Sequence, residues 1–350
     1  MRELLTNIEF KTESGLMDSS IIETSAYARA GLLGNPTDGY YGKTISIIVR
    51  NFGARISLYP SPELRIEPQE QDLNIYRNMY HLVDSVRLTG YYGGSRLVKA
   101  AIKKFSEYCD QQSIRLDNKN FTIRYHSSIP RQVGLAGSSA IVTATMRALM
   151  RYYKVSIPKK MLPSLVLAAE KDELGINAGL QDRVAQVYEG CVYMDFNKTL
   201  MSERGYGEYE PLNPKLLPNL YLAYKIDLGK VSGTVLNDIR SRYDKGDQAV
   251  IDTLEEMAQL AEEGKQAIND QDTSKLNKLI NRNFDLRCRI MNISEENKTL
   301  VQTARACGAS AKFTGSGGSI IGLYENDEVL NKLVVSLKKI NARVIKPYIL

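Results

Sequence analysis

Two glycine-bounded segments carry the side chains best suited to chemistry on a phosphate group. The first, residues 129–140, reads IPRQVGLAGSSA and leads into apolar residues at helical spacing. Glycine lets the backbone turn tightly and approach a ligand, and the N-terminus of a helix favours an anion. The hydroxyls of Ser138 and Ser139 could bind phosphate oxygens or magnesium. The same pattern is also typical of an ordinary glycine turn with serine N-caps.

The second segment places acidic residues on both sides of a glycine turn. It reads EKDELG over 170–175 and AGLQDR over 178–183. Magnesium usually takes one or two carboxylates together with nucleotide phosphates as ligands. An aspartate beside an arginine, as Asp182 is beside Arg183, can be held ionised and accept a hydroxyl proton. The alternative is a solvated helix face with an aspartate N-cap.

A third segment, residues 312–319 (KFTGSGGS), stands between two predicted strands. It predicts a tight hairpin, or a loop that lies under phosphates or packs against the glycine- and serine-containing loop at 134–140 (the serine loop). The familiar phosphate motifs are absent. Residues 42–44 (GKT) do not complete a Walker A loop, because Thr37 stands where its first glycine should be. Ile320 likewise replaces the last glycine of a dinucleotide-binding fingerprint.

The pattern of strands and helices that must position these segments predicts two α+β domains. Alternating or β-branched residues predict strands at 28–33, 44–50, 54–60, 121–126, 190–196 and 221–226. Helical spacing predicts helices at 73–109 (interrupted near 90–95), 138–154, 159–173, 232–270 and 273–307. Residues 202–218, rich in glycine, proline, asparagine and charge, predict a linker. We therefore predict one domain over 1–205 and another over 206–350.

The composition excludes several classes of protein. The chain has 350 residues, 43% hydrophobic and 25% charged, as in ordinary globular proteins. No segment approaches the ~18 apolar residues of a membrane span, and the N-terminal segment lacks the apolar core of a secretory signal. We therefore expect a cytoplasmic protein with no membrane partner. The net charge of +6 is not gathered in a basic stripe, so we expect no nucleic-acid partner.

Cysteine and histidine offer little chemistry in this chain. The four cysteines lie far apart, without metal-ligand spacing, at Cys109, Cys191, Cys288 and Cys307. We expect them to be reduced thiols. The two histidines, His81 and His126, leave few candidates for a mechanism that needs an imidazole base.

The order of the glycine-rich segments resembles that of the GHMP kinases. Residues 26–42 (AYARAGLLGNPTDGYYG) are similar to the N-terminal signature of galactokinases and mevalonate kinases, residues 134–140 to the second motif, and residues 312–319 to the third. The GNP of the first motif and the additional residue before the serines of the second resemble plant-type glucuronokinases. The resemblance implies an N-terminal domain like ribosomal protein S5 domain 2, a ferredoxin-like C-terminal domain, and ATP bound between them.

The resemblance also implies roles in catalysis and in metal binding. Asp182 takes the position of the catalytic aspartate, and Arg29 assists at the substrate hydroxyl. Ser139 takes the position of a magnesium or phosphate ligand. Glu170 matches the acidic magnesium ligand, with Glu173 as the alternative.

Two further sets of residues follow from the same resemblance. The nucleotide-binding residues that it implies are Gly134, Leu135, Ala136, Gly137, Ser138, Ser139, Ala140, Gly315, Ser316 and Gly317. The sugar-binding residues that it implies are Asn35, Asp38, Arg183 and Gly317. Asn35 stands where the family has glutamate or histidine, so the resemblance does not extend to galactose-like recognition.

The activity implied is transfer of the ATP γ-phosphate to the anomeric hydroxyl of D-glucuronate, giving glucuronate 1-phosphate, towards UDP-glucuronate. A uronate carboxylate needs a cation, ideally a guanidinium that binds it through two N–H groups. The candidates are Arg131, Arg183, Arg287 and Arg289. We expect the arginines of residues 283–289 to lie on a helix and face solvent. The alternatives are a kinase for another sugar or uronic acid, such as galacturonate, and a non-catalytic sugar-binding regulator with the same fold.

Overall fold

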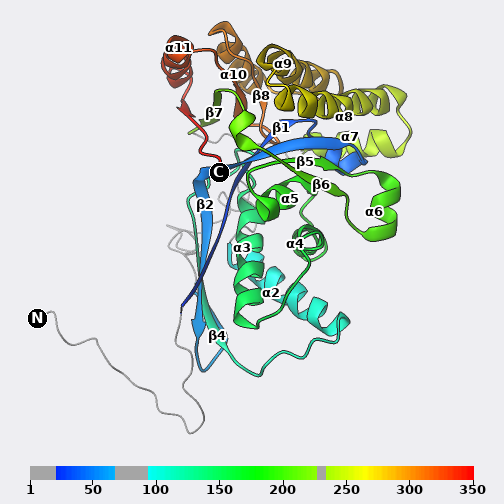
Figure 1. Ribbon diagram of the computed structural model, residues 1–350, viewed down its shortest axis with the longest axis vertical. Helices are drawn as coiled ribbons and strands as arrows, with labels where there is room; N and C mark the ends of the chain where they lie inside the picture. The colour runs from blue at the N-terminus through cyan, green and yellow to red at the C-terminus, as the bar shows by residue number, and fades with distance from the viewer. Residues whose placement is uncertain (1–20, 68–93, 227–233) are drawn as a thin grey trace, which may run out of the picture.

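The computed structural model describes residues 21–67, 94–226 and 234–350 (Figure 1). The part of the predicted helical pattern at 73–93 lies outside these residues, and so does His81. The remainder of that pattern is helix α2 (Gly94–Gln111). Among the helices of the described ranges, none is both long and apolar enough to cross a membrane.

Six strands form the first sheet: β1 (Ile22–Leu33), β2 (Lys43–Pro60), β3 (Arg65–Glu67), β4 (Phe121–Ser127), β5 (Cys191–Asp195) and β6 (Glu208–Leu212). Their order is β3-β4-β2-β5-β6, and β1 pairs with β2. The strands predicted at 44–50 and 54–60 are one long strand, β2. Tyr27 pairs with Gly53, but Ala28 pairs with Val49, so residues 50–52 bulge out of the ladder. A bulge bends a strand without ending it, which explains why the sequence pattern indicates two strands.

Helices α2, α3 (Gly137–Tyr152), α4 (Leu162–Lys171) and α5 (Gln181–Tyr188) gather beside β1, β2 and β4 (Figure 1). Helix α3 packs against β1 and β2. Its fully buried alanines, Ala140, Ala144 and Ala148, recur every four residues. This spacing puts them on one helix face, where small side chains let the helix lie close to the strands.

The prediction of a linker at 202–218 is wrong. This stretch contains the end of α6 (Lys198–Arg204), strand β6 and a short 3-10 helix, η3 (Pro214–Leu216). Strand β6 is the edge of the first sheet, where proline and exposed polar residues are tolerated, so its composition resembles that of a loop. The domain division at 205 and 206 stays a prediction. Strand pairing places β6 with the first sheet and the next strand, β7 (Leu220–Lys225), with the second.

Four antiparallel strands form the second sheet: β7 (Leu220–Lys225), β8 (Lys312–Phe313), β9 (Ser319–Leu323) and β10 (Ala342–Ile345). Their order is β10-β7-β9-β8. The fourth strand along the chain, β10, therefore lies beside the first, β7, and the third, β9, lies between the first and the second, β8. This is the predicted ferredoxin-like order. The helices of this part are α7 (Thr234–Asp244), α8 (Gln248–Asn269), α9 (Thr273–Ile290), α10 (Glu295–Ala306) and α11 (Asp327–Lys338).

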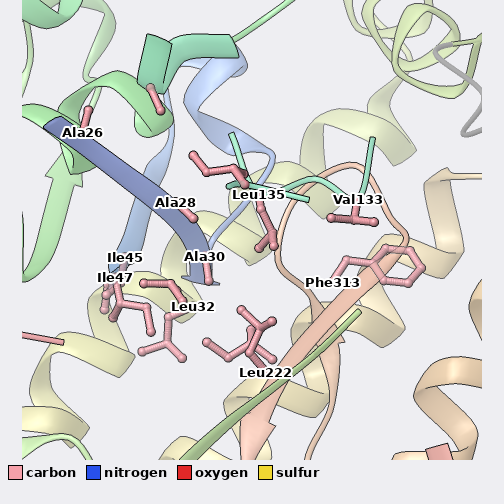
Figure 2. Packing of buried hydrophobic residues seen from close by; sticks show 14 of the residues in the cluster. Ala26, Ala28, Ala30, Leu32, Ile45, Ile47, Val133, Leu135, Leu222 and Phe313 are labelled. Carbon is pink, nitrogen blue, oxygen red and sulfur yellow. The ribbon is translucent and has the colours of Figure 1, made fainter. Parts of the chain in front are cut away.

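The two sheets share one apolar core, and the serine loop lies within it (Figure 2). Ala30 of β1, Leu135 of the loop, Leu222 of β7 and Phe313 of β8 are all buried in the same cluster. Burying a large apolar side chain contributes about 1.5–3 kcal/mol to stability. The backbone of the glycine-rich segments is therefore held in place from both sheets.

Candidate active site

A cavity of about 490 Å³ lies where the three glycine-rich segments meet. Its walls come from β1 and the turn after it, the loop at 132–138, the residues at 176–183, the end of α9 with the residues after it, and the loop at 315–316. A second cavity of about 600 Å³ adjoins it. Both cavities are lined by Gln132, Gly134, Ala136 and Ser138. The serine loop therefore forms a wall common to two binding spaces.

Arg29 and Asp182, predicted to be catalytic, meet in the first cavity. Arg29 Nη2 lies 2.5 Å from Asp182 Oδ1. Its other terminal nitrogen, Nη1, donates to the carbonyl oxygens of Thr314 at 2.5 Å and Gly134 at 3.3 Å. Arg29 is almost fully buried, so this guanidinium joins the carboxylate to both glycine-rich loops.

The surroundings of Asp182 keep it ionised. It lies in the first turn of α5, and Arg183 Nη1 is 3.3 Å from its Oδ2. Burial acts to raise the pKa of Asp182, but the charges of Arg29 and Arg183 outweigh burial and hold that pKa below its ordinary value. This carboxylate can accept a hydrogen bond from a hydroxyl at neutral pH.

Arg183 also forms a buried ion pair with Glu170, the predicted magnesium ligand. Arg183 Nε donates to Glu170 Oε2 at 2.8 Å, and both side chains are almost fully buried. Glu170 Oε1 has no hydrogen-bond partner among the described residues. The alternative ligand, Glu173, instead lies 2.7 Å from Lys103 and 3.0 Å from Lys104 of α2. The unpartnered oxygen therefore favours Glu170 over Glu173 as a ligand for a cation.

Asp38 is the second carboxyl group of the cavity. The backbone N–H of Gln181 donates to its Oδ2 at 3.1 Å. This close approach requires glycine at position 179, because a Cβ atom there would lie 2.0 Å from the same oxygen. Burial, and then the negative charge of Asp182, raise the pKa of Asp38 from 3.8 to about 6. The two aspartates of one cavity thus have pKa values shifted in opposite directions.

The second and third glycine-rich segments are in direct backbone contact. Gly134 has a φ of +72°, and a Cβ atom there would lie 2.9 Å from the nitrogen of Ser316. A Cβ atom at Gly315 would lie 2.4 Å from the Gly134 oxygen. Strands β8 and β9 also pair on either side of residues 314–318, the glycine turn of the third segment. Two of the predicted arrangements therefore hold together: the segment is a hairpin, and it packs against the serine loop.

Most of the predicted nucleotide-binding residues border a cavity: Gly134, Leu135, Ala136, Gly137, Ser138, Gly315 and Ser316. Ser139, Ala140 and Gly317 do not line either one. Ser139 is fully buried, and its Oγ donates to the Ala136 oxygen at 3.2 Å, whereas Ser138 lines both cavities. The roles of these residues stay predictions.

The predicted sugar-binding residues Asn35, Asp38 and Arg183 all line the first cavity, and Gly317 does not. Sequence reasoning gave no role to Lys312, which lies behind Asn35. Its Nζ donates to Asn35 Oδ1 and, at 2.9 Å, to the Gly31 oxygen. Burial lowers the pKa of Lys312 well below its ordinary value, and the nearby arginines lower it further. This amine fixes the orientation of the Asn35 amide.

Helix α9 contributes a residue whose position was predicted wrongly. Asn283 of this helix accepts a hydrogen bond from the Gly34 N–H at 2.8 Å. One turn further on, Arg287 is 3% exposed and lines the first cavity. The prediction that these arginines face solvent is therefore wrong for Arg287. It is confirmed for Arg289, whose side chain is 56% exposed.

Comparison with known proteins places the chain in a family. Residues 96–190 match the N-terminal domain model of GHMP kinases, and residues 265–342 match the C-terminal model. Glucuronokinase 1 of Arabidopsis thaliana is 45% identical over 87% of this chain and 85% of its own length. Probable glucuronokinase 2 of the same plant is 47% identical over 87% and 84%.

Solved structures agree with this assignment at the level of the fold. Galactokinase of Lactococcus lactis, in complex with galactose, aligns with a TM-score of 0.75 over 94% of this chain and 93% of its own. Its sequence identity is 17%, so the alignment shows the fold alone. Together with the glucuronokinase matches and the two-domain architecture, it leads to one conclusion. The chain belongs to the GHMP kinases, in the group that includes the Arabidopsis glucuronokinases.

Proposed function

We propose that this protein transfers the γ-phosphate of ATP to the anomeric hydroxyl of D-glucuronate. One observation carries the proposal: the ionised Asp182, held by Arg29, lies in a cavity whose wall is formed by two contacting glycine-rich loops. The Arabidopsis relatives that cover most of this chain are named glucuronokinases, which supports glucuronate as the acceptor.

The two adjoining cavities suit two substrates. The serine loop borders both, and its backbone turns through a left-handed Ala136 into the N-terminus of α3, which favours phosphate groups. We place the phosphates along this loop, the nucleoside in the second cavity and the sugar in the first. Ser138, which lines both cavities, is then the hydroxyl nearest to the point of transfer.

In the reaction, a bond forms between the anomeric oxygen and the γ-phosphorus while the bond from that phosphorus to ADP breaks. Asp182 accepts a hydrogen bond from the anomeric hydroxyl, orients it and takes up its proton. Its lowered pKa makes it a weak base, which suits a loose transition state that asks little of the nucleophile. Arg29 keeps the carboxylate in place, so that positioning and charge carry the catalysis.

Of the two predicted magnesium ligands, neither of which lines a cavity, Glu170 has an oxygen that fits the ion. Its Oε1 is buried without a hydrogen-bond partner in the described part of the chain, and magnesium prefers such an oxygen ligand. Glu170, with Ser139 as the second predicted ligand, would hold the ion. When bound, magnesium neutralises charge on the transferring phosphate. Arg183 fixes the orientation of the Glu170 carboxylate.

A screen of ADP release over free sugars and uronic acids tests the proposal. We expect glucuronate to give the highest kcat/KM, and phosphorus NMR of the product to show a phosphate on the anomeric carbon. Galacturonate and glucose are the informative competitors. If galacturonate or a neutral sugar is the better substrate, the proposed acceptor is wrong. ATP consumption without sugar phosphate would contradict the reaction itself.

A further inference from the structure

The proposed substrate carries a carboxylate that the catalytic residues leave without a partner. An ionised carboxylate that enters a cavity loses hydration and needs a cation, best a guanidinium with two parallel N–H groups. Three arginines of the first cavity already have acidic neighbours. Arg29 contacts Asp182, Arg183 contacts Glu170, and Arg240 lies 3.5 Å from Asp244.

Arg287 differs from these three arginines. It has no ion pair with any described residue, and its Nη1 has no hydrogen-bond partner among them. Its Nε donates to Met291 Sδ at 3.0 Å, and a thioether is a weak acceptor. Burial lowers the pKa of Arg287 only to about 10, so it remains a cation at neutral pH. A buried charge without a counter-ion is costly, and a bound anion would offset this cost.

Two elements fix this guanidinium at the cavity wall. Its central carbon lies 5.2 Å from the ring centroid of Phe313 in β8, which is cation–π geometry. Phe284 of α9 packs edge-on against the same ring, with centroids 5.1 Å apart. One turn before Arg287, Asn283 binds the turn that carries Asn35. Arg287 is therefore positioned relative to the proposed sugar-binding side chains before any ligand arrives.

We infer that Arg287 binds the carboxylate of the sugar acid and thereby selects uronic acids over neutral sugars. This inference rests on the proposed function and names the residue that sets its specificity. The other candidates do not fit this role. Arg131 lines the second cavity and not the first, Arg183 is paired with Glu170, and Arg289 is exposed beside Glu256.

A matched pair of variants tests the inference. Arg287→Gln removes the charge, and Arg289→Gln removes an exposed arginine two residues along the same helix. Each is assayed with glucuronate and with glucuronamide, whose neutral amide replaces the carboxylate. Losing one partner of a buried charge pair predicts a fall of about 100-fold in kcat/KM for glucuronate in Arg287→Gln. We expect a change of about twofold or less for glucuronamide, for the KM of ATP and for Arg289→Gln on either sugar. Arg287→Lys should recover about tenfold of the loss, since it restores charge without the planar fork.

The outcomes separate this inference from the proposed function. If wild type prefers glucuronate and Arg287→Gln keeps the wild-type ratio of glucuronate to glucuronamide activity, the inference is overturned and the proposed function stands. If the wild-type kcat/KM for glucose equals that for glucuronate, both the inference and the proposed function are contradicted. If wild type prefers another uronic acid, only the identity of the sugar changes, and the same variants are compared on that acid and its amide.

A folding control keeps the test decisive. Thermal unfolding of both glutamine variants shows whether Arg287→Gln is folded. If it is not, calorimetry compares glucuronate binding to wild type and to Arg287→Lys. Equal affinities would overturn the inference, and an affinity about tenfold weaker in Arg287→Lys would support it.

Discussion

The two walls of the first cavity differ in how their charges are balanced. On the wall built from β1 and α5, Arg29 and Arg183 each contact a carboxylate, in Asp182 and Glu170. On the wall built from α9 and β8, Arg287 is buried and makes no ion pair with any described residue, and neither does the buried Lys312 behind Asn35. Arginines on both walls are almost fully buried, so burial does not distinguish them. The walls differ in their counter-ions.

This difference separates two tasks. A paired arginine fixes the position of a carboxylate and shifts its pKa. A carboxylate that accepts a proton from a hydroxyl needs both. The unpaired Arg287 leaves a buried positive charge that an anionic ligand can neutralise. The first wall thus suits phosphoryl transfer, and the second suits recognition of an acid.

Removing the carboxylate of the paired wall should give the largest effect. Asp182→Asn should lower kcat by about 1,000-fold, the loss typical of a positioned proton acceptor. ATP affinity should stay close to that of wild type, because the nucleotide contacts lie on the glycine-rich loops. Steady-state kinetics and nucleotide titration measure both quantities. Asp172→Asn, at an exposed carboxylate after α4, is the control, and near-normal turnover in Asp182→Asn would remove Asp182 from the mechanism.

Breaking the second pair of that wall should have a smaller effect on turnover and a clear effect on stability. Glu170→Gln removes the carboxylate that Arg183 Nε binds and leaves only Asp182, at 3.3 Å, beside this buried guanidinium. Breaking a buried ion pair predicts a loss of about 3 kcal/mol in the free energy of unfolding. The magnesium concentration for half-maximal activity should also rise by about tenfold or more, because a carboxylate ligand is lost. Urea denaturation and a magnesium titration measure these effects.

Glu173→Gln serves as the matched control, since the ion pairs of Glu173 with described residues are made with Lys103 and Lys104 of α2. It should leave the magnesium requirement unchanged. If Glu173→Gln rather than Glu170→Gln shifts that requirement, the assignment of the two glutamates is reversed.

The smallest expected effect concerns pH. Because the pKa of Asp38 is raised to about 6, this carboxyl is protonated below that pH and can no longer accept two hydrogen bonds from a sugar. We expect kcat/KM to fall by about tenfold per pH unit below pH 6, and this acidic limb of the pH profile to disappear in Asp38→Asn. An unchanged limb in Asp38→Asn would assign it to another group, such as the phosphates of ATP.

The free energy of unfolding should also depend on the protonation of Asp38. The folded-state pKa of Asp38 lies above the unfolded value near 3.8, so the native state binds more protons between pH 4 and 6. This group therefore makes the protein less stable as pH rises through that window. Asp38→Asn should remove that contribution, which pH-dependent urea denaturation can detect.

The fold was largely predictable because its signals are local. The strand at 121–126, the helix after the serine loop and the two strands around 312–319 are where alternation, helical spacing and glycine predict them. The linker was not predictable from composition, because an edge strand such as β6 carries the same polar residues and proline as a loop.

The candidate site was predictable only where a motif carries it. Arg29, Asp182 and the glycine-rich loops lie within recognisable motifs, and the structure brings them together. Arg287 and Lys312 required tertiary information, because arginine and lysine are usually exposed. One signal was available for Arg287: Leu276, Ile280, Phe284 and Arg287 recur every three or four residues and are buried on one helix face.

Gly179 has no proposed contact with a ligand. Its lack of a side chain nevertheless controls how the activity of the site depends on pH. A methyl group there would displace the Asp38 carboxyl, whose protonation we expect to lower kcat/KM below pH 6. Related kinases that carry alanine at this position would then work over a different acidity range, even if every side chain that touches the sugar were the same.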